Sequence, residues 1–209
     1  MMNITTPRDI RVSQRGALVA AATMAFVALT VGASQAEAQV IPPQVPANLE
    51  VEHGNTPFLV GHAEGTQNYI CLLAPKGFAW TFFGPQATLF GDDGQQLTTH
   101  FLSANPDENG TLRATWQHSA DTSAVWAKAV ASSTDPAYVA PGAIPWLKLQ
   151  VVGVEQGPTG GTALFGTTFV QRVHTTGGIA PSANGCANAG DIGKKALVPY
   201  TADYVFYQN

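Results

Sequence analysis

The chain has 209 residues, of which 45% are hydrophobic and 11% are charged, and its formal net charge at pH 7 is −4. A weakly acidic chain without a basic stripe is a poor match for nucleic acid or an anionic membrane surface, so we expect neither as a partner. Its length fits one domain behind a short leader. Its cysteines and histidines form no Cys/His quartet of the kind that holds structural zinc.

Residues 1–38 have the organisation of a cleaved signal peptide. Three arginines precede an apolar run at 17–31, and Ala36-Glu37-Ala38 supplies a small-x-small cleavage site. The alternative is a membrane anchor, but the run is shorter than the roughly 20 residues that a spanning helix needs. We therefore expect a protein exported to the periplasm or the exterior, without stable membrane insertion once the leader has been removed.

A Pro-rich extended lead-in follows at residues 39–56, and a single β domain is predicted for residues 57–209. Its first strand signals lie at 58–65, 67–73, 78–82 and 87–101. Asp93-Gly94, at the centre of the last run, marks a hairpin because glycine tolerates the positive φ of such turns. Further strand candidates lie at 113–117, 123–131, 144–154, 162–173 and 200–206.

The clearest strand is the segment 144–154. Leu147, Leu149 and Val151 fall on one side of an extended chain, and the residues between them fall on the other. Residues 124–131 could instead form a short helix on propensity. About ten short strands with frequent turns predict an all-β fold, a single-domain antiparallel β-sandwich or barrel.

Cys71 and Cys186 are the only cysteines. In an oxidising compartment an isolated pair is more often a disulfide than a redox or metal site. The alternative is two buried free thiols. A disulfide closing so long a loop would stabilise the fold by roughly 4–5 kcal/mol on the chain-entropy account.

Seven stretches along the mature chain carry a family resemblance. They are VPANL (45–49), HAEGTQ (62–67), GPQATL (84–89), THF (99–101), AIPWL (143–147), QRV with TGG (171–173 and 176–178) and VPYTADY (198–204). Together they resemble domain of unknown function 3455, a family of exported bacterial and fungal proteins. The resemblance implies an exported domain, and no catalytic residue is carried over from it.

Four residues are candidate metal ligands: His62, Glu64, His100 and His174. Neutral imidazole is a common transition-metal ligand, and His62 and Glu64, two apart in a strand, face the same side. The other two histidines lie in or beside strands and would join them if those strands were neighbours. The alternative is histidines that only pack and hydrogen-bond within the fold.

Six residues are candidates for a ligand-binding surface: Gln67, Tyr69, Trp80, Trp116, Trp126 and Trp146. Exposed tryptophan beside polar groups is a common way for β-proteins to bind sugars or peptides. The alternative is that these rings fill the core.

The sequence contains no Gly-x-Ser-x-Gly elbow, Walker loop or His-Glu-x-x-His motif, so it identifies no catalytic residue and implies no cofactor. The leading hypothesis is a non-catalytic envelope or extracellular protein that binds a carbohydrate, a peptide or a small molecule. One alternative is an enzyme of hydrolase or lyase type, or a metalloprotein, with a His/Glu site. Another is a structural or stress-related envelope protein.

Overall fold

The computed structural model of the chain describes residues 39–209. The predicted signal peptide and its alternative, a membrane anchor, both lie in residues 1–38, outside the described part. Within residues 39–209, no helix is long and apolar enough to cross a membrane.

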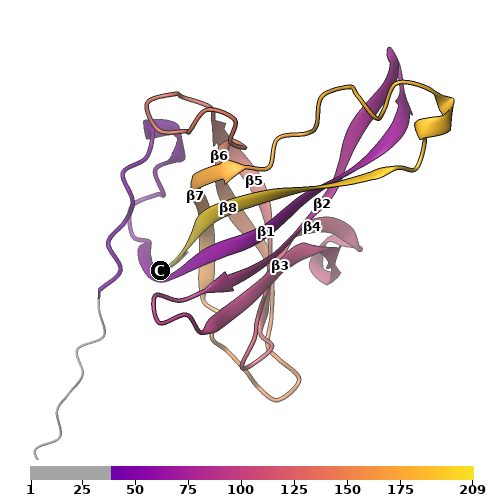
Figure 1. The fold of residues 1–209 in the computed structure, drawn as a ribbon. Helices are drawn as coiled ribbons and strands as arrows, with labels where there is room; N and C mark the ends of the chain where they lie inside the picture. Colours follow the sequence, from indigo (N-terminus) through magenta and orange to yellow (C-terminus); the bar gives the residue numbers. More distant parts are fainter. Residues whose placement is uncertain (1–38) are drawn as a thin grey trace, which may run out of the picture. The chain divides into compact units, whose positions relative to one another are not determined.

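Eight strands close into a barrel in which each strand runs antiparallel to its neighbours and the last pairs with the first (Figure 1). The strands are β1 (Thr56–Ala74), β2 (Gly77–Phe90), β3 (Gln96–Asn105), β4 (Thr111–His118), β5 (Ala124–Ser133), β6 (Trp146–Glu155), β7 (Thr167–Gly177) and β8 (Lys195–Gln208). Three short 3-10 helices are η1 (Ala47–Leu49), η2 (Pro106–Glu108) and η3 (Ala189–Asp191).

The all-β, single-domain prediction is confirmed, and of the two predicted architectures the protein adopts the barrel. The barrel has eight strands and not about ten, because segments 58–65 and 67–73 are one strand, as are 78–82 and 87–90. Gly65 does not end β1. A Cβ atom there would overlap the backbone of Gln86 and Ala87, so glycine lets β1 and β2 approach closely.

Two local predictions are settled by the structure. The Asp93-Gly94 turn joins β2 to β3, with Gly94 at φ +76° and a hydrogen bond of 2.9 Å from the Gly91 amide to the Gln95 carbonyl. Residues 124–131, for which a helix was the alternative, belong to strand β5.

The main core lies inside the barrel. Trp116, Tyr204, Phe206 and Leu89 are almost completely buried there. Leu149 belongs to this cluster, and Leu147 and Val151 pack against it, which confirms the predicted inner face of the strand that is now β6.

A second core lies on the outer side of the barrel wall. Trp146 and Val173 are buried there against Leu49 of the lead-in. The amide of Gln171, also buried, donates to the Leu49 carbonyl at 2.6 Å. The lead-in is therefore packed against the barrel, which explains why both faces of β6 carry buried side chains.

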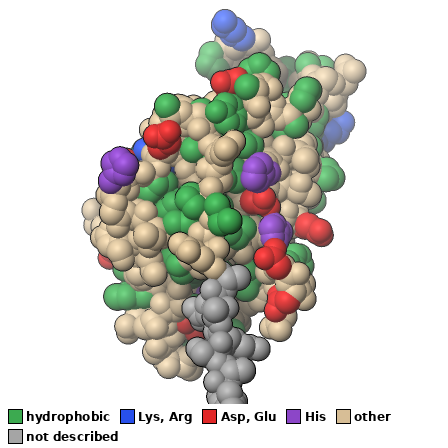
Figure 2. Space-filling view, turned by 90° about the vertical axis from the view of Figure 1, so that its left-hand side faces the viewer, with side chains coloured by type: hydrophobic (Ala, Val, Ile, Leu, Met, Phe, Trp, Pro, Cys, Tyr) green, Lys and Arg blue, Asp and Glu red, His purple; other side chains and the backbone are tan. Residues whose placement is uncertain are grey.

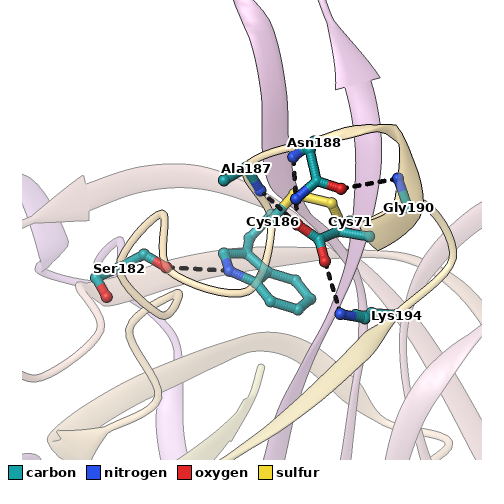
Figure 3. Close-up of a disulfide and its surroundings, with 9 residues drawn as sticks. Cys71, Ser182, Cys186, Ala187, Asn188, Gly190 and Lys194 are labelled. Carbon is teal, nitrogen blue, oxygen red and sulfur yellow. Dashed lines mark hydrogen bonds and ion pairs between the residues drawn. A yellow bond between two sulfur atoms is a disulfide. The ribbon is translucent and has the colours of Figure 1, made fainter.

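Three strands continue past the barrel as an arm, which we define as residues 66–74 of β1, 77–86 of β2 and 195–199 of β8 (Figure 1). The predicted disulfide is present. It joins Cys71 in the arm to Cys186, 115 positions along, with Cα atoms 5.4 Å apart, and so ties the loop 179–194 to the arm (Figure 3). The indole nitrogen of Trp80 adds a hydrogen bond of 3.1 Å to the Ser182 carbonyl.

Candidate functional site

A cavity of about 300 Å³, open to solvent on one side, lies where the arm leaves the barrel. Its apolar wall comes from the main core, with Trp116, Leu149 and Tyr204 lining it. Pockets of this size and composition are typical of sites for small organic ligands.

The cavity borders a split in the barrel wall. β2 and β3 pair only between Ala87–Phe90 and Gln96–His100. Beyond this segment the two strands separate: the rest of β2 belongs to the arm, and the rest of β3 pairs with β4 alone among the strands of residues 39–209. Pro85, His100 and Leu102 line both the cavity and a trough of about 640 Å³ at this split. The cavity and the trough are therefore neighbours on either side of these three residues.

Arg172 is the cationic group that β7 contributes to the cavity. Its Nε and Nη2 atoms donate to the Pro145 carbonyl at 3.2 and 2.8 Å, which fixes the guanidinium in place. A guanidinium has five N–H donors, so three are not engaged by the Pro145 carbonyl. An arginine held in this way is suited to a carboxylate, sulfonate or phosphate.

Two further donors around the cavity have no acceptor within the described part of the chain. The side-chain amide nitrogen of Gln67 and the indole nitrogen of Trp116 are both buried, and neither has a hydrogen-bond partner on residues 39–209. Buried donors in native proteins are nearly always paired. Both residues line the cavity, but neither nitrogen is itself exposed to it, and the Gln67 side chain lies near the Tyr200 hydroxyl.

His100 supplies a neutral imidazole. Its ring stacks on Trp116 with centroids 4.3 Å apart, and its Nδ1 donates to the Thr115 carbonyl at 2.9 Å. Burial lowers the pKa of His100 to about 3. The carbonyl can only accept, so Nδ1 keeps the proton and Nε2 is left as an acceptor.

Two tyrosines complete the buried polar groups. The hydroxyls of Tyr200 and Tyr204 are 3.2 Å apart. Burial raises the pKa of both, so they are neutral at ordinary pH. Tyr204 lines the cavity, and its hydroxyl is paired with that of Tyr200.

The charge of the cavity is opposite to that of the whole protein. Arg113, Lys128 and Arg172 line it, three of the seven lysines and arginines in residues 39–209, and none of its lining residues in that part of the chain is a carboxylate. Arg113 is paired with Glu108 at 2.7 Å. The positive field of the remaining groups favours an anion.

A second polar cluster lies on the outside of the barrel, where histidine and acidic side chains gather on one face (Figure 2). His62 donates from Nδ1 to Asp203 at 2.7 Å and from Nε2 to Asp92 at 2.9 Å. His174 donates from Nδ1 to the other Asp203 oxygen at 2.8 Å. We call this chain of Asp92, His62, Asp203 and His174 the outer network.

The structure separates the four predicted metal ligands. Asp203 brings His62 and His174 together, whereas His100 lies on the opposite side of the wall, inside the barrel. Glu64 is exposed on β1, opposite Thr88 and Thr201. Within residues 39–209, no three His, Cys, Asp or Glu side chains are grouped so that they could hold a metal ion.

The six predicted ligand-surface residues are also divided. Gln67 and Trp116 line the cavity. Trp126 and Trp146 are buried elsewhere, and Tyr69 is buried with its hydroxyl on the Gly178 carbonyl. Trp80 is partly exposed beside the disulfide loop. These residues therefore form no common surface.

The residue that sequence reasoning missed is Arg172. It lies two positions after Val170, which is buried in the main core, so both side chains face the barrel interior. An arginine on the core face of a predicted strand was the available signal.

A family described as "Protein of unknown function (DUF3455)" matches residues 52–208 of the chain. That match covers all eight strands. Comparisons with curated proteins and with solved structures gave no match.

Proposed function

We propose that this chain, which belongs to the DUF3455 family of proteins of unknown function, is a binding protein whose barrel takes a small organic anion with an apolar body. Of the ligand classes that the sequence suggests, the small molecule is the one that the cavity supports best.

The observation that carries the proposal is the set of donors around the cavity. Gln67 and Trp116 have buried N–H groups without an acceptor on residues 39–209, and the guanidinium of Arg172 stands with them. An unpaired buried polar group costs about 1–3 kcal/mol. We expect a ligand that moves aside the atoms covering these donors, and brings acceptor oxygens to them, to offset that cost, which gives anions an advantage over apolar molecules of the same shape.

The apolar lining sets the rest of the ligand. Leu147, Leu149 and Ala127 line the cavity together with the face of Trp116. These groups favour an aromatic or branched aliphatic body. A polymer such as an extended glycan has less support, because three of the four tryptophans are buried and the fourth, Trp80, is only partly exposed.

The groups that line the cavity are better suited to binding a ligand than to catalysis. A general base works best with a pKa near the working pH, whereas burial lowers the pKa of His100 to about 3. Burial also raises the pKa of Tyr204, so this hydroxyl is a poor source of a nucleophile. The groups are suited to hold a ligand by hydrogen bonds and charge.

We place this binding outside the cytoplasm. The organisation of residues 1–38 as a signal peptide supports export. The Cys71–Cys186 disulfide supports it as well, because such bonds persist mainly in oxidising compartments.

The test uses two dyes of one skeleton, anilinonaphthalene sulfonate and the uncharged N-phenylnaphthylamine. We expect the wild type to bind the sulfonate at least about tenfold more tightly, a difference of about 1.4 kcal/mol. Arg172→Met should remove most of this preference, and Lys76→Met, at the exposed tip of the arm, should keep it. The measurement is a fluorescence titration at fixed salt.

Two outcomes would contradict the proposal. One is equal affinity of the wild type for both dyes, and the other is an Arg172→Met protein that keeps the sulfonate preference. Arg172→Lys guards against loss of structure, because it keeps the charge but replaces the planar fork that reaches the Pro145 carbonyl. We expect it to retain part of the preference.

A further inference from the structure

Within residues 39–209, the arm has two free sheet edges. Residues 77–86 of β2 pair with β1 alone, because β3 pairs with β2 only from Ala87 onward. Residues 195–199 of β8 also pair with β1 alone, because β7 pairs with β8 only from Tyr200 onward. Such edges present unpaired backbone groups to other chains, so natural edges usually carry charges or prolines.

The two edges differ in this protection. The β8 edge begins at Lys195 and ends at Pro199. β2 has no charged residue in its 14 positions, and its only proline, Pro85, lies at the barrel end of the free edge. Ala79, Thr81 and Phe82 are exposed along it. The β2 edge is therefore open to strand addition.

The arm is also held in shape without a partner. The disulfide and the Trp80–Ser182 hydrogen bond fix the loop 179–194 to it, and the Asp191 carboxylate pairs with Lys194 at 2.6 Å within that loop (Figure 3). A fixed edge loses little conformational entropy when a strand is added.

We propose that the β2 edge pairs with the β2 edge of a second copy of this chain, in a two-fold antiparallel dimer. In the register centred on Trp80, each Trp80 faces the partner subunit's Trp80 and each Phe78 faces the partner subunit's Phe82. Ala79 and the partner subunit's Thr81 meet on the other face. No charges meet in this register, and aromatic cross-strand pairs are favourable.

A second copy is the occupant that the edge chemistry favours. Joining β2 to the β8 edge of another copy would place a strand against Lys195 and Pro199 and would leave a free edge at each end, which builds an open fibre. Pairing β2 with β2 uses both unprotected edges and closes the assembly. The contact also lies beside the cavity, because Phe82 lines it.

The experiment measures the molar mass of the purified protein by light scattering after size-exclusion chromatography, at concentrations on the order of 1–100 μM. We expect the wild type to have twice the monomer mass. The double variant Ala79→Lys/Thr81→Lys puts four positive charges across the contact and should give the monomer mass. Leu73→Lys/Leu197→Lys adds the same charge at exposed arm positions outside β2 and should remain dimeric.

A monomeric wild type, a dimeric Ala79→Lys/Thr81→Lys variant or a monomeric control would each overturn the proposal. A second measurement tests the register with variants that add no charge to β2. Mixing Ala79→Cys protein with Thr81→Cys protein under mild oxidation should give a covalent dimer several times faster than either protein alone. Equal rates in all three samples would mean random collision and would contradict the two-fold pairing.

Discussion

His100 and His62 lie on opposite sides of the barrel wall, and the same side chain has a different state in each place. Inside, His100 is 3% exposed and gives one proton to a carbonyl, and burial lowers its pKa to about 3. Outside, His62 donates from both ring nitrogens to carboxylates, which requires both protons. Hydrogen bonds with Asp203 and then Asp92 raise the pKa of His62.

The different states of His100 and His62 explain why the positive charge at the cavity comes from an arginine and not from a histidine. A histidine there gives up its charge because burial disfavours the protonated form. A guanidinium keeps its charge throughout the working pH range of proteins, and Arg172 places one at the cavity wall. The outer network can use histidine because water and two carboxylates support its charge.

The largest expected effect is on the free energy of unfolding, where the loss of core packing inside the barrel should outweigh the loss of ion pairs on its outside. Trp116→Ala removes a ring that is fully buried in the main core, so the free energy of unfolding should fall by about 3–5 kcal/mol. Asp203→Asn breaks only the outer network and should cost about 1 kcal/mol or less. Urea unfolding measures both variants. Similar decreases in the free energy of unfolding would contradict the claim that core packing contributes more to stability than the outer network.

The next prediction is the response of His100 to acid. An unfolded histidine titrates near 6.5, and the folded pKa is about 3. The contribution of His100 to the free energy of unfolding is therefore fully present above pH ~6.5. As pH falls toward ~3, the unfolded chain binds a proton that the folded chain does not, and stability drops by about 1.4 kcal/mol per pH unit. His100→Gln should be less stable at neutral pH but should decline less steeply in acid. Parallel curves for the two proteins would contradict this account.

A smaller effect concerns the backbone of His174, which has φ +49°. Side chains with a Cβ are strained in this left-handed region, and glycine is not. His174→Gly and His174→Ala both lose the bond to Asp203, so their difference isolates the strain. We expect the glycine variant to be more stable by about 1 kcal/mol in thermal unfolding. An equal or more stable alanine variant would contradict the left-handed geometry.

The smallest effect is the pH response of the outer network, and its sign is opposite to that of His100. The pKa of His62 is raised by its carboxylate partners, so its stabilisation is complete below the unfolded value near 6.5. It is lost as pH rises through the higher folded pKa. The advantage of the wild type over His62→Gln should therefore shrink from mildly acidic to alkaline pH, within about 0.2–1 kcal/mol. An advantage that grows with pH would reverse the assignment.

Local patterns predicted those parts of the fold whose cause is local. Alternation identified the inner face of β6, and Asp93-Gly94 identified a turn, because both depend on residues close in sequence. The disulfide was predicted because only one pair of cysteines exists. Barrel closure was left open beside the sandwich, since it depends on β8 pairing with β1 across most of the chain.

The candidate site was predicted less completely, for the same reason. Gln67 and Trp116 were expected to bind a ligand together with four aromatic residues that lie elsewhere, because a pattern does not show which faces are later covered. Trp146 is buried by the lead-in, a segment about a hundred positions earlier. The bond between His62 and Asp203 spans 141 positions, so neither its existence nor its geometry could be read from nearby residues.

The most direct test of the central claim is a crystal of the protein soaked with a bromobenzoate, with the bromine located by its anomalous scattering. We expect a bromine peak in the cavity against Trp116 and Leu149, with the carboxylate at hydrogen-bond distance from the Arg172 guanidinium. Bromine found only outside the barrel, or a carboxylate turned away from Arg172, would contradict it.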